Sequence, residues 1–259
     1  MKIGVCTGTD IERIRIAKET GFDFVEGHCQ NIVKIGYNEL EKIKNAGIPM
    51  LTANCFIRMK VVGKERDEEA IKAYLADLFE KSSYLGIRCL VFGSSGARNI
   101  PDYQTYEETY EQIVYFLREL VAPLAEKYDI PVAIEPLRKA ETNIINTVAD
   151  GVALAAKVGS PYIKVLADVK HVVSSDESLE SLGQYKGVLI HAHTSNPYPP
   201  EELGKNRVYP AKGDGFNQDS FFMPLIAAGV ETCSIEADVI DFPTDCQKSY
   251  PMLVKYRGL

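Results

Sequence analysis

The sequence PVAIE at Pro131–Glu135 is a short apolar segment that ends in an acidic residue. Three later segments have the same form and also end in a metal-binding residue type: YIKVLAD at Tyr162–Asp168, GVLIHAH at Gly187–His193 and ETCSIE at Glu231–Glu236. Apolar runs of this kind are typical of parallel strands that are buried on both faces. If the four strands are neighbours in one closed barrel, their polar ends meet at its mouth, where the sequence then predicts a metal site.

The rest of the chain continues the same alternation of strand and helix. Four earlier strands are predicted at Lys2–Thr7, Phe22–Glu26, Pro49–Phe56 and Arg88–Gly93. Helices are predicted at Ile11–Thr20, Tyr37–Ala46, Asp67–Leu85, Tyr103–Lys127, Val148–Val158, Glu177–Leu182, Gln218–Ala228 and from about Pro243. Eight strand–helix units without a linker favour a (β/α)8 TIM barrel that forms one domain over residues 1–259. The rival is an open doubly wound sheet, but CTGTDIER after the first strand lacks its usual GxGxxG loop.

Composition narrows the class of protein. The net charge is −7, which argues against nucleic acid or an anionic membrane as a partner. No apolar stretch approaches the roughly 18 residues of a membrane span, and MKIGVCTGTD does not resemble a signal peptide. The six cysteines are dispersed and form no CxxC pair, so we expect reduced thiols in a cytoplasmic protein.

Three carboxylates and one imidazole form a mostly oxygen donor set. Such a set favours Mn²⁺, Mg²⁺ or Co²⁺ over a metal that prefers thiolate. Mn²⁺ is the first expectation, and Zn²⁺ stays open. Each residue taken alone is better explained as an ordinary polar residue at a strand end, but four in consecutive strands favour the metal. His191 and His193 lie on one face of their strand, so spacing alone leaves open which of them is the ligand.

Two strings carry a resemblance to a known family. They are IEPLRKAETNIINTVADGVALAAKVGSP at Ile134–Pro161 and LADVKH at Leu166–His171, with HAHTSNP and SIEAD downstream. They resemble the ketose 3-epimerases of the D-tagatose, D-allulose and L-ribulose type. These belong to the xylose isomerase-like TIM-barrel superfamily of sugar isomerases and epimerases.

The resemblance implies a role for each matching residue. The implied metal ligands are Glu135, Asp168, His193 and Glu236, of which Glu135 and Glu236 are also the acid/base pair. Glu141 and His171 match positions that contact substrate. The family's arginine position holds Pro199 here, and the nearest candidate for its role is Arg207.

The chemistry that follows is removal of a proton next to a ketose carbonyl through an enediolate, with C3 epimerisation of a free ketose as the leading reaction. The metal stabilises the developing negative charge, and two carboxylates on opposite faces remove and return the proton. The small-molecule partner is a sugar or polyol derivative, and a homo-oligomer stays open. The main alternative is a lyase or dehydratase that acts on an inosose-like or keto-sugar substrate with the same site. A phosphodiesterase would need more histidines than the four present, and a non-catalytic sugar-binding barrel would not need both glutamates.

Several nearby residues have weaker assignments. The polar loop Thr194–Phe216 is expected to act as a substrate lid or wall, while Glu26 and His28 are either pocket residues or solvated loop residues. Phe56 or Phe92 is expected to form an aromatic wall for the sugar. Arg98, in GSSGARNIP, is either an anion contact or part of a plain loop.

Overall fold

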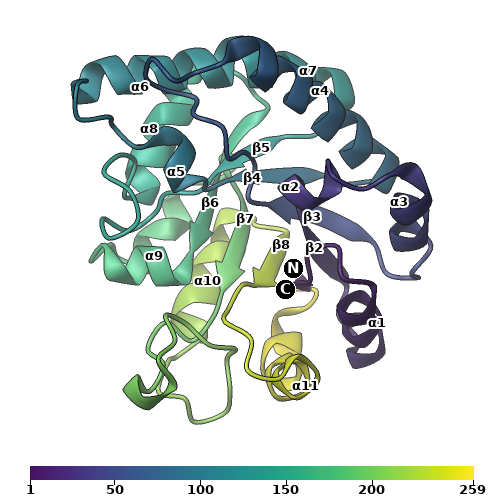
Figure 1. Cartoon of the computed structure of the whole chain (residues 1–259). Coiled ribbons are helices and arrows are strands. Elements are labelled where there is room, and N and C mark those ends of the chain that lie inside the picture. Colours follow the sequence, from purple (N-terminus) through teal and green to yellow (C-terminus); the bar gives the residue numbers. More distant parts are fainter.

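Eight parallel strands pair in chain order and close on themselves (Figure 1). They appear in a computed structural model that describes all 259 residues. The strands are β1 (Lys2–Cys6), β2 (Phe24–His28), β3 (Met50–Asn54), β4 (Cys89–Phe92), β5 (Val132–Ile134), β6 (Ile163–Asp168), β7 (Leu189–Thr194) and β8 (Thr232–Ile235). The predicted TIM barrel is therefore confirmed, and every predicted strand is present. Most strands are slightly shorter than predicted, but β2 begins and ends two residues later and β7 extends to Thr194.

Helices surround the barrel on its outside (Figure 1). In chain order they are α1 (Ile11–Thr20), α2 (Cys29–Ile32), α3 (Tyr37–Lys44), α4 (Glu68–Leu85), α5 (Ser95–Arg98), α6 (Tyr106–Tyr115), η1 (Phe116–Val121), α7 (Ala122–Tyr128), α8 (Val148–Val158), α9 (Val169–Ser174), η2 (Glu180–Gln184), η3 (Glu201–Leu203), α10 (Asp219–Ala228), α11 (Phe242–Leu253) and η4 (Val254–Tyr256). None of them combines the length and apolar character that crossing a membrane requires.

Local sequence signals explain where the helices begin and end. Asp67 caps α4 by accepting a hydrogen bond from the Ala70 N–H, and Gly86 ends the helix with a φ of 79°. That left-handed conformation favours glycine because it has no Cβ.

Two helix predictions need correction. The predicted helix Tyr103–Lys127 is interrupted by the wider π-helical turn η1, which is followed by Pro123 in the first turn of α7. Proline cannot donate the usual backbone hydrogen bond, so the regular helical pattern is broken there. The predicted helix Glu177–Leu182 is a short 3-10 turn at Glu180–Gln184, and the real helix of this unit, α9, begins directly after Asp168.

The lower part of the barrel interior is filled by an aromatic ring. A Cβ on Gly4 would lie only 2.4 Å from the ring of Phe24, so glycine at this position makes room for the ring inside the barrel. The Phe24 ring lies below His191, at a centroid distance of 6.3 Å. Apolar packing below and polar side chains above therefore place the polar site at the carboxyl ends of the strands.

Candidate metal centre and substrate pocket

The four residues singled out by the sequence lie together at the mouth of the barrel. Glu135 directly follows β5, Asp168 and His193 lie in β6 and β7, and Glu236 directly follows β8. One ligand atom from each lies within 4.8 Å of the others. His193 Nδ1 is 3.1 Å from Glu135 Oε1, 3.1 Å from Glu236 Oε2 and 3.8 Å from Asp168 Oδ2. The predicted grouping is thus present in the structure.

Glu26 is a member of the site that the sequence analysis rated too low. It is completely buried inside the barrel, and its two oxygens lie 3.0 Å from Nε2 of His191 and 3.0 Å from Nε2 of His193. Burial alone would raise the pKa of Glu26, but the two imidazoles outweigh burial and lower the pKa well below its usual value. Glu26 is therefore a carboxylate that accepts a hydrogen bond from each imidazole.

This arrangement separates the roles of the two histidines. The Nδ1 atom of His191 lies 2.8 Å from the hydroxyl and 3.0 Å from the carbonyl of Thr232, away from the carboxylate cluster. His193 donates its Nε2–H to Glu26, which leaves Nδ1 facing the three carboxylates. Of the two histidines, His193 is the one whose Nδ1 atom faces the carboxylate cluster.

The donor set fits a divalent cation. Three carboxylates this close repel one another unless positive charge lies among them. Oxygen Oε2 of Glu236 is buried and lies 2.8 Å from Arg207 and 3.1 Å from Nδ1 of His193. Neither contact has the alignment of a hydrogen bond, so this oxygen has no hydrogen-bond partner. Oxygen-rich sites with one imidazole suit hard or borderline divalent metals. Glu135, Asp168, His193 and Glu236 could therefore hold such an ion.

Arg207 reaches this cluster from the long loop after β7. Its guanidinium lies 2.5 Å from Asp168 Oδ2 and 2.8 Å from Glu236 Oε2. Backbone pairing of Val208 with Asn196 and Asp238 holds this part of the loop in place. Burial would raise the pKa of Glu236, but Arg207 and His193 outweigh burial and lower the pKa strongly. The sequence-predicted substitute for the family's arginine thus lies in the site.

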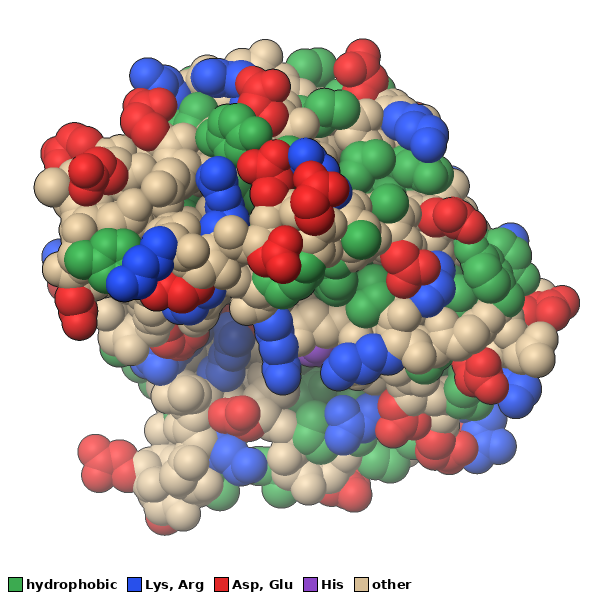
Figure 2. All heavy atoms as spheres, turned by 45° about the horizontal axis from the view of Figure 1, so that its top comes forward, with side chains coloured by type: hydrophobic (Ala, Val, Ile, Leu, Met, Phe, Trp, Pro, Cys, Tyr) green, Lys and Arg blue, Asp and Glu red, His purple; other side chains and the backbone are tan.

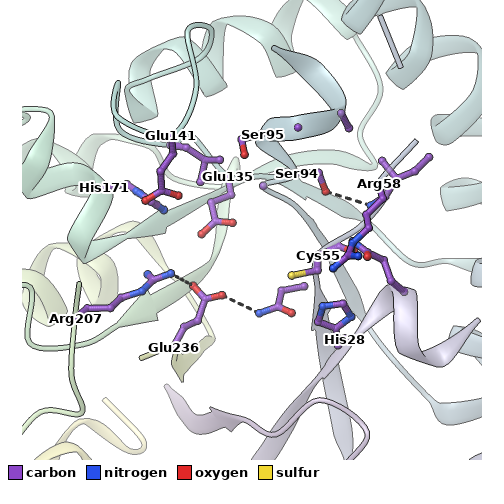
Figure 3. A pocket seen from close by; sticks show the side chains of 17 residues that line it. His28, Cys55, Arg58, Ser94, Ser95, Glu135, Glu141, His171, Arg207 and Glu236 are labelled. Atoms are coloured by element: carbon purple, nitrogen blue, oxygen red, sulfur yellow. Dashed lines mark hydrogen bonds and ion pairs between the residues drawn. The ribbon is translucent and has the colours of Figure 1, made fainter. Parts of the chain in front are cut away.

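Glu141 and His171 lie on the side of the pocket next to Arg207 (Figure 3). His171 is buried, and its backbone N–H donates to Asp168 Oδ1 at 3.0 Å. Glu141 accepts a hydrogen bond from Arg138 at 2.8 Å, and Arg138 also donates to Asn206 at 3.1 Å. Arg138 therefore joins the loop after β5 to the loop after β7.

A cavity of about 420 Å³ opens above the cluster. Figure 2 shows a hollow on this face, with a histidine inside it and basic side chains at its border. Asn54, another residue that the sequence analysis did not single out, lines the cavity and donates to Glu236 Oε1 at 2.9 Å. The volume is in the range of small-molecule sites.

The predicted aromatic wall is wrong. Phe56 and Phe92 are fully buried and pack against each other at a centroid distance of 5.8 Å, outside the cavity lining. Strand alternation explains this, because Val91 of β4 faces the barrel interior and Phe92 faces the helices. The apolar residues that line the cavity are Cys55, Ile57, Ala97 and Leu137.

Arg98 binds backbone carbonyls of the protein and does not line the cavity, so it is not the anion contact that the sequence left open. It is completely buried and donates to the carbonyls of Phe92 at 3.0 Å and Glu135 at 2.7 Å. Burial lowers the pKa of Arg98 to about 10. Arg98 therefore fixes the backbone at Glu135, at the end of β5.

Two cysteines near the site have unreactive thiols. Cys6 forms a second group with Glu26 and His193, within the same 4.8 Å limit. Burial raises the pKa of Cys6 well above its usual value, and burial raises the pKa of Cys55 to about 12. Both thiols are protonated near neutral pH, which makes them poor ligands and nucleophiles.

Comparison with known proteins agrees with the barrel fold. The family model described as xylose isomerase-like TIM barrel matches residues 14–245. The chain is 26% identical over 209 residues to the D-psicose 3-epimerase of Agrobacterium fabrum, covering 77% of this chain and 68% of that protein. Among solved structures, a D-psicose 3-epimerase in the presence of D-fructose has a TM-score of 0.82 and 20% identity, covering 100% of both chains. A 3-keto-D-glucoside 4-epimerase from E. coli has a TM-score of 0.81 and 21% identity, covering 98% of this chain and 99% of that one.

Proposed function

The chain belongs to the xylose isomerase-like TIM-barrel family, and from this premise we propose that it is a divalent-metal-dependent ketose 3-epimerase. The observation that carries the proposal is the grouping of Glu135, Asp168, His193 and Glu236 within 4.8 Å beneath a cavity of about 420 Å³. The curated relative with a known reaction, a D-psicose 3-epimerase, supports the reaction type. The six free cysteines fit a reducing, cytoplasmic location.

We assign the two glutamates that border the cavity to proton transfer. Glu135 follows β5 and Glu236 follows β8, so β6 and β7 separate them around the mouth of the barrel. One glutamate takes the proton from the carbon beside the ketose carbonyl, and the other returns a proton to the opposite face of the planar intermediate. Carboxylates in this role contribute about 10²–10⁴-fold to the rate. When bound, the metal supplies Lewis-acid stabilisation of the negative charge that develops on the substrate.

The remaining polar residues orient the sugar. In this proposal Glu141, His171 and Arg207 bind hydroxyl and carbonyl oxygens of the substrate on one side of the cavity. Arg207 also keeps Glu236 ionised, since its charge lowers the pKa of that carboxyl group. An ionised Glu236 can accept a proton, and its lowered pKa makes it a weaker base than an ordinary carboxylate. Mn²⁺ is the proposed metal, with Mg²⁺ or Co²⁺ as alternatives, because the donor set is mostly oxygen.

Solvent deuterium exchange tests this proposal. Protein freed of metal by chelation and reloaded with Mn²⁺ is incubated in D₂O with ketoses, and NMR follows the hydrogen on the carbon next to the carbonyl. We expect metal-dependent deuterium uptake together with the C3 epimer. Absence of uptake from a broad ketose panel by the metal-loaded protein would contradict the proposal. The lyase or dehydratase alternative gives a product that has lost the mass of water or of a leaving group, which mass spectrometry detects.

A further inference from the structure

Arg58 is a cation that faces the substrate cavity without a partner in the protein. It lines the cavity with His28 on the side opposite Arg207, His171 and Glu141 (Figure 3). Its guanidinium makes no hydrogen bond or ion pair with any other residue, whereas Arg207 and Arg138 each contact a carboxylate. Gln30 and Ser95, which also line the cavity, are neutral.

The other charges around the cavity are compensated. The metal cluster has three carboxylates; Arg207 contacts two of them, and a bound divalent ion would balance the remaining charge. Glu141 is paired with Arg138 at 2.8 Å. Of the two arginines that line the cavity, Arg58 is exposed to solvent and lacks the carboxylate partners that Arg207 has.

The loop that carries Arg58 is anchored on both sides. Before Arg58, the Ile57 N–H donates to the Ser94 hydroxyl at 3.2 Å, and the buried Phe56 accepts a hydrogen bond from Tyr74 at 2.5 Å. After Arg58, the Val61 N–H donates to the Ala97 carbonyl at 2.9 Å. Buried and bonded neighbours hold the backbone of Arg58 at the cavity, so a ligand there does not have to order the loop.

We propose that the natural substrate is an acidic ketose, whose carboxylate or phosphate binds Arg58 while its reacting carbons lie at the metal cluster. This inference rests on the proposed function and adds the substrate class to it. A guanidinium offers paired N–H donors that match a carboxylate or phosphate, and such bonds are stronger than those between neutral groups. A neutral ketose would leave Arg58 exposed to solvent, whereas an acidic ketose would give it a carboxylate or phosphate partner.

Three sugars that differ only at C6 test the proposal: D-fructose, D-fructuronate and D-fructose 6-phosphate. Binding to the Mn²⁺-loaded protein is measured by calorimetry, and deuterium uptake at C3 is measured in parallel. We expect at least one acidic sugar to bind about 10–100-fold more tightly than D-fructose. This is the difference that one charged hydrogen-bonding partner makes to a binding constant. Preference for fructuronate identifies a carboxylate, and preference for the phosphate ester identifies a phosphate.

The variant Arg58→Gln identifies the residue responsible. It should remove the advantage of the acidic sugar and leave binding of D-fructose within about twofold. The control Arg15→Gln changes an exposed arginine on α1 that contacts Glu12, and it should leave the preference intact. If neither acidic sugar binds more tightly than D-fructose, or if Arg58→Gln weakens all three sugars equally, the inference is wrong.

The two proposals fail in different ways. Exchange without a charge preference would leave the epimerase proposal standing and overturn the acidic substrate. If acidic sugars bind more tightly through Arg58 but no sugar exchanges deuterium, the acidic ligand stands and the epimerase proposal is overturned.

Discussion

Glu26 gives a quantitative test of how the barrel prepares His193 for a metal. Metal-binding histidines usually donate their other N–H to a carboxylate, and loss of that partner costs about 10–100-fold in affinity. Here Glu26 accepts from Nε2 of His193 at 3.0 Å, which keeps Nδ1 free of a proton when the metal binds. The same carboxylate accepts from His191 at 3.0 Å.

The structure predicts a graded effect for two substitutions. In Glu26→Gln the amide oxygen can still accept from His193, while the amide N–H₂ faces His191. His191 can then donate its Nδ1–H to the Thr232 carbonyl 3.0 Å away, so only the negative charge is lost. We expect Glu26→Gln to weaken Mn²⁺ binding about tenfold, or about 1.4 kcal/mol. Glu26→Leu removes both acceptors, and we expect about 100-fold.

Competition with a chelating dye measures the Mn²⁺ affinity, and urea unfolding checks that each variant is folded. The control is Glu177→Gln, because Glu177 is a carboxylate that accepts from the Val148 N–H at 2.8 Å, at the start of α8 and outside the metal site. This control should lower stability without changing Mn²⁺ affinity. Wild-type affinity in folded Glu26→Leu protein would refute the reasoning.

Three further predictions follow from the site. Burial would lower the pKa of His193, but Glu26 and Glu236 outweigh burial and raise it well above its usual 6.5, so metal binding near neutral pH should release a proton. Below that raised pKa, the affinity for Mn²⁺ should then rise about tenfold per pH unit. Calorimetry in buffers of different ionisation enthalpy detects the released proton. Binding heats that do not depend on the buffer would contradict this prediction. Glu236→Gln should slow deuterium exchange by about 10²–10⁴-fold, whereas Glu231→Gln, just before β8, should not; equal rates in the two variants would exclude the proton-transfer role. Arg98→Lys should lower the free energy of unfolding by about 1.5–3 kcal/mol in urea titrations, because lysine cannot reach both carbonyls that Arg98 binds; unchanged stability would show that these bonds matter little.

The sequence predicted the barrel and the grouping of the four polar residues for a simple reason. Carboxyl ends of parallel strands all lie at one mouth of a closed barrel, so the end of each apolar run marks the same place. By that rule Glu26, which ends the run FDFVE, should have received the same weight as Glu135. That run was the available signal, and it was underused.

Other parts of the site depend on contacts that no local pattern reveals. Glu26 and His193 are 167 residues apart and meet only because the barrel closes. Arg98 is in a short polar string typical of a loop, and only the packed structure shows that it is buried against the backbone of Glu135. That Arg58 lines the cavity without a carboxylate partner, while Arg207 and Glu141 are paired, is visible only in the folded structure.

Anomalous diffraction from crystals grown with Mn²⁺ tests the central claim most directly. We predict one strong manganese peak bound by Glu135, Asp168, Glu236 and Nδ1 of His193, with Nε2 of His193 still bonded to Glu26. A peak at another group of residues, or none at saturating Mn²⁺, would contradict it.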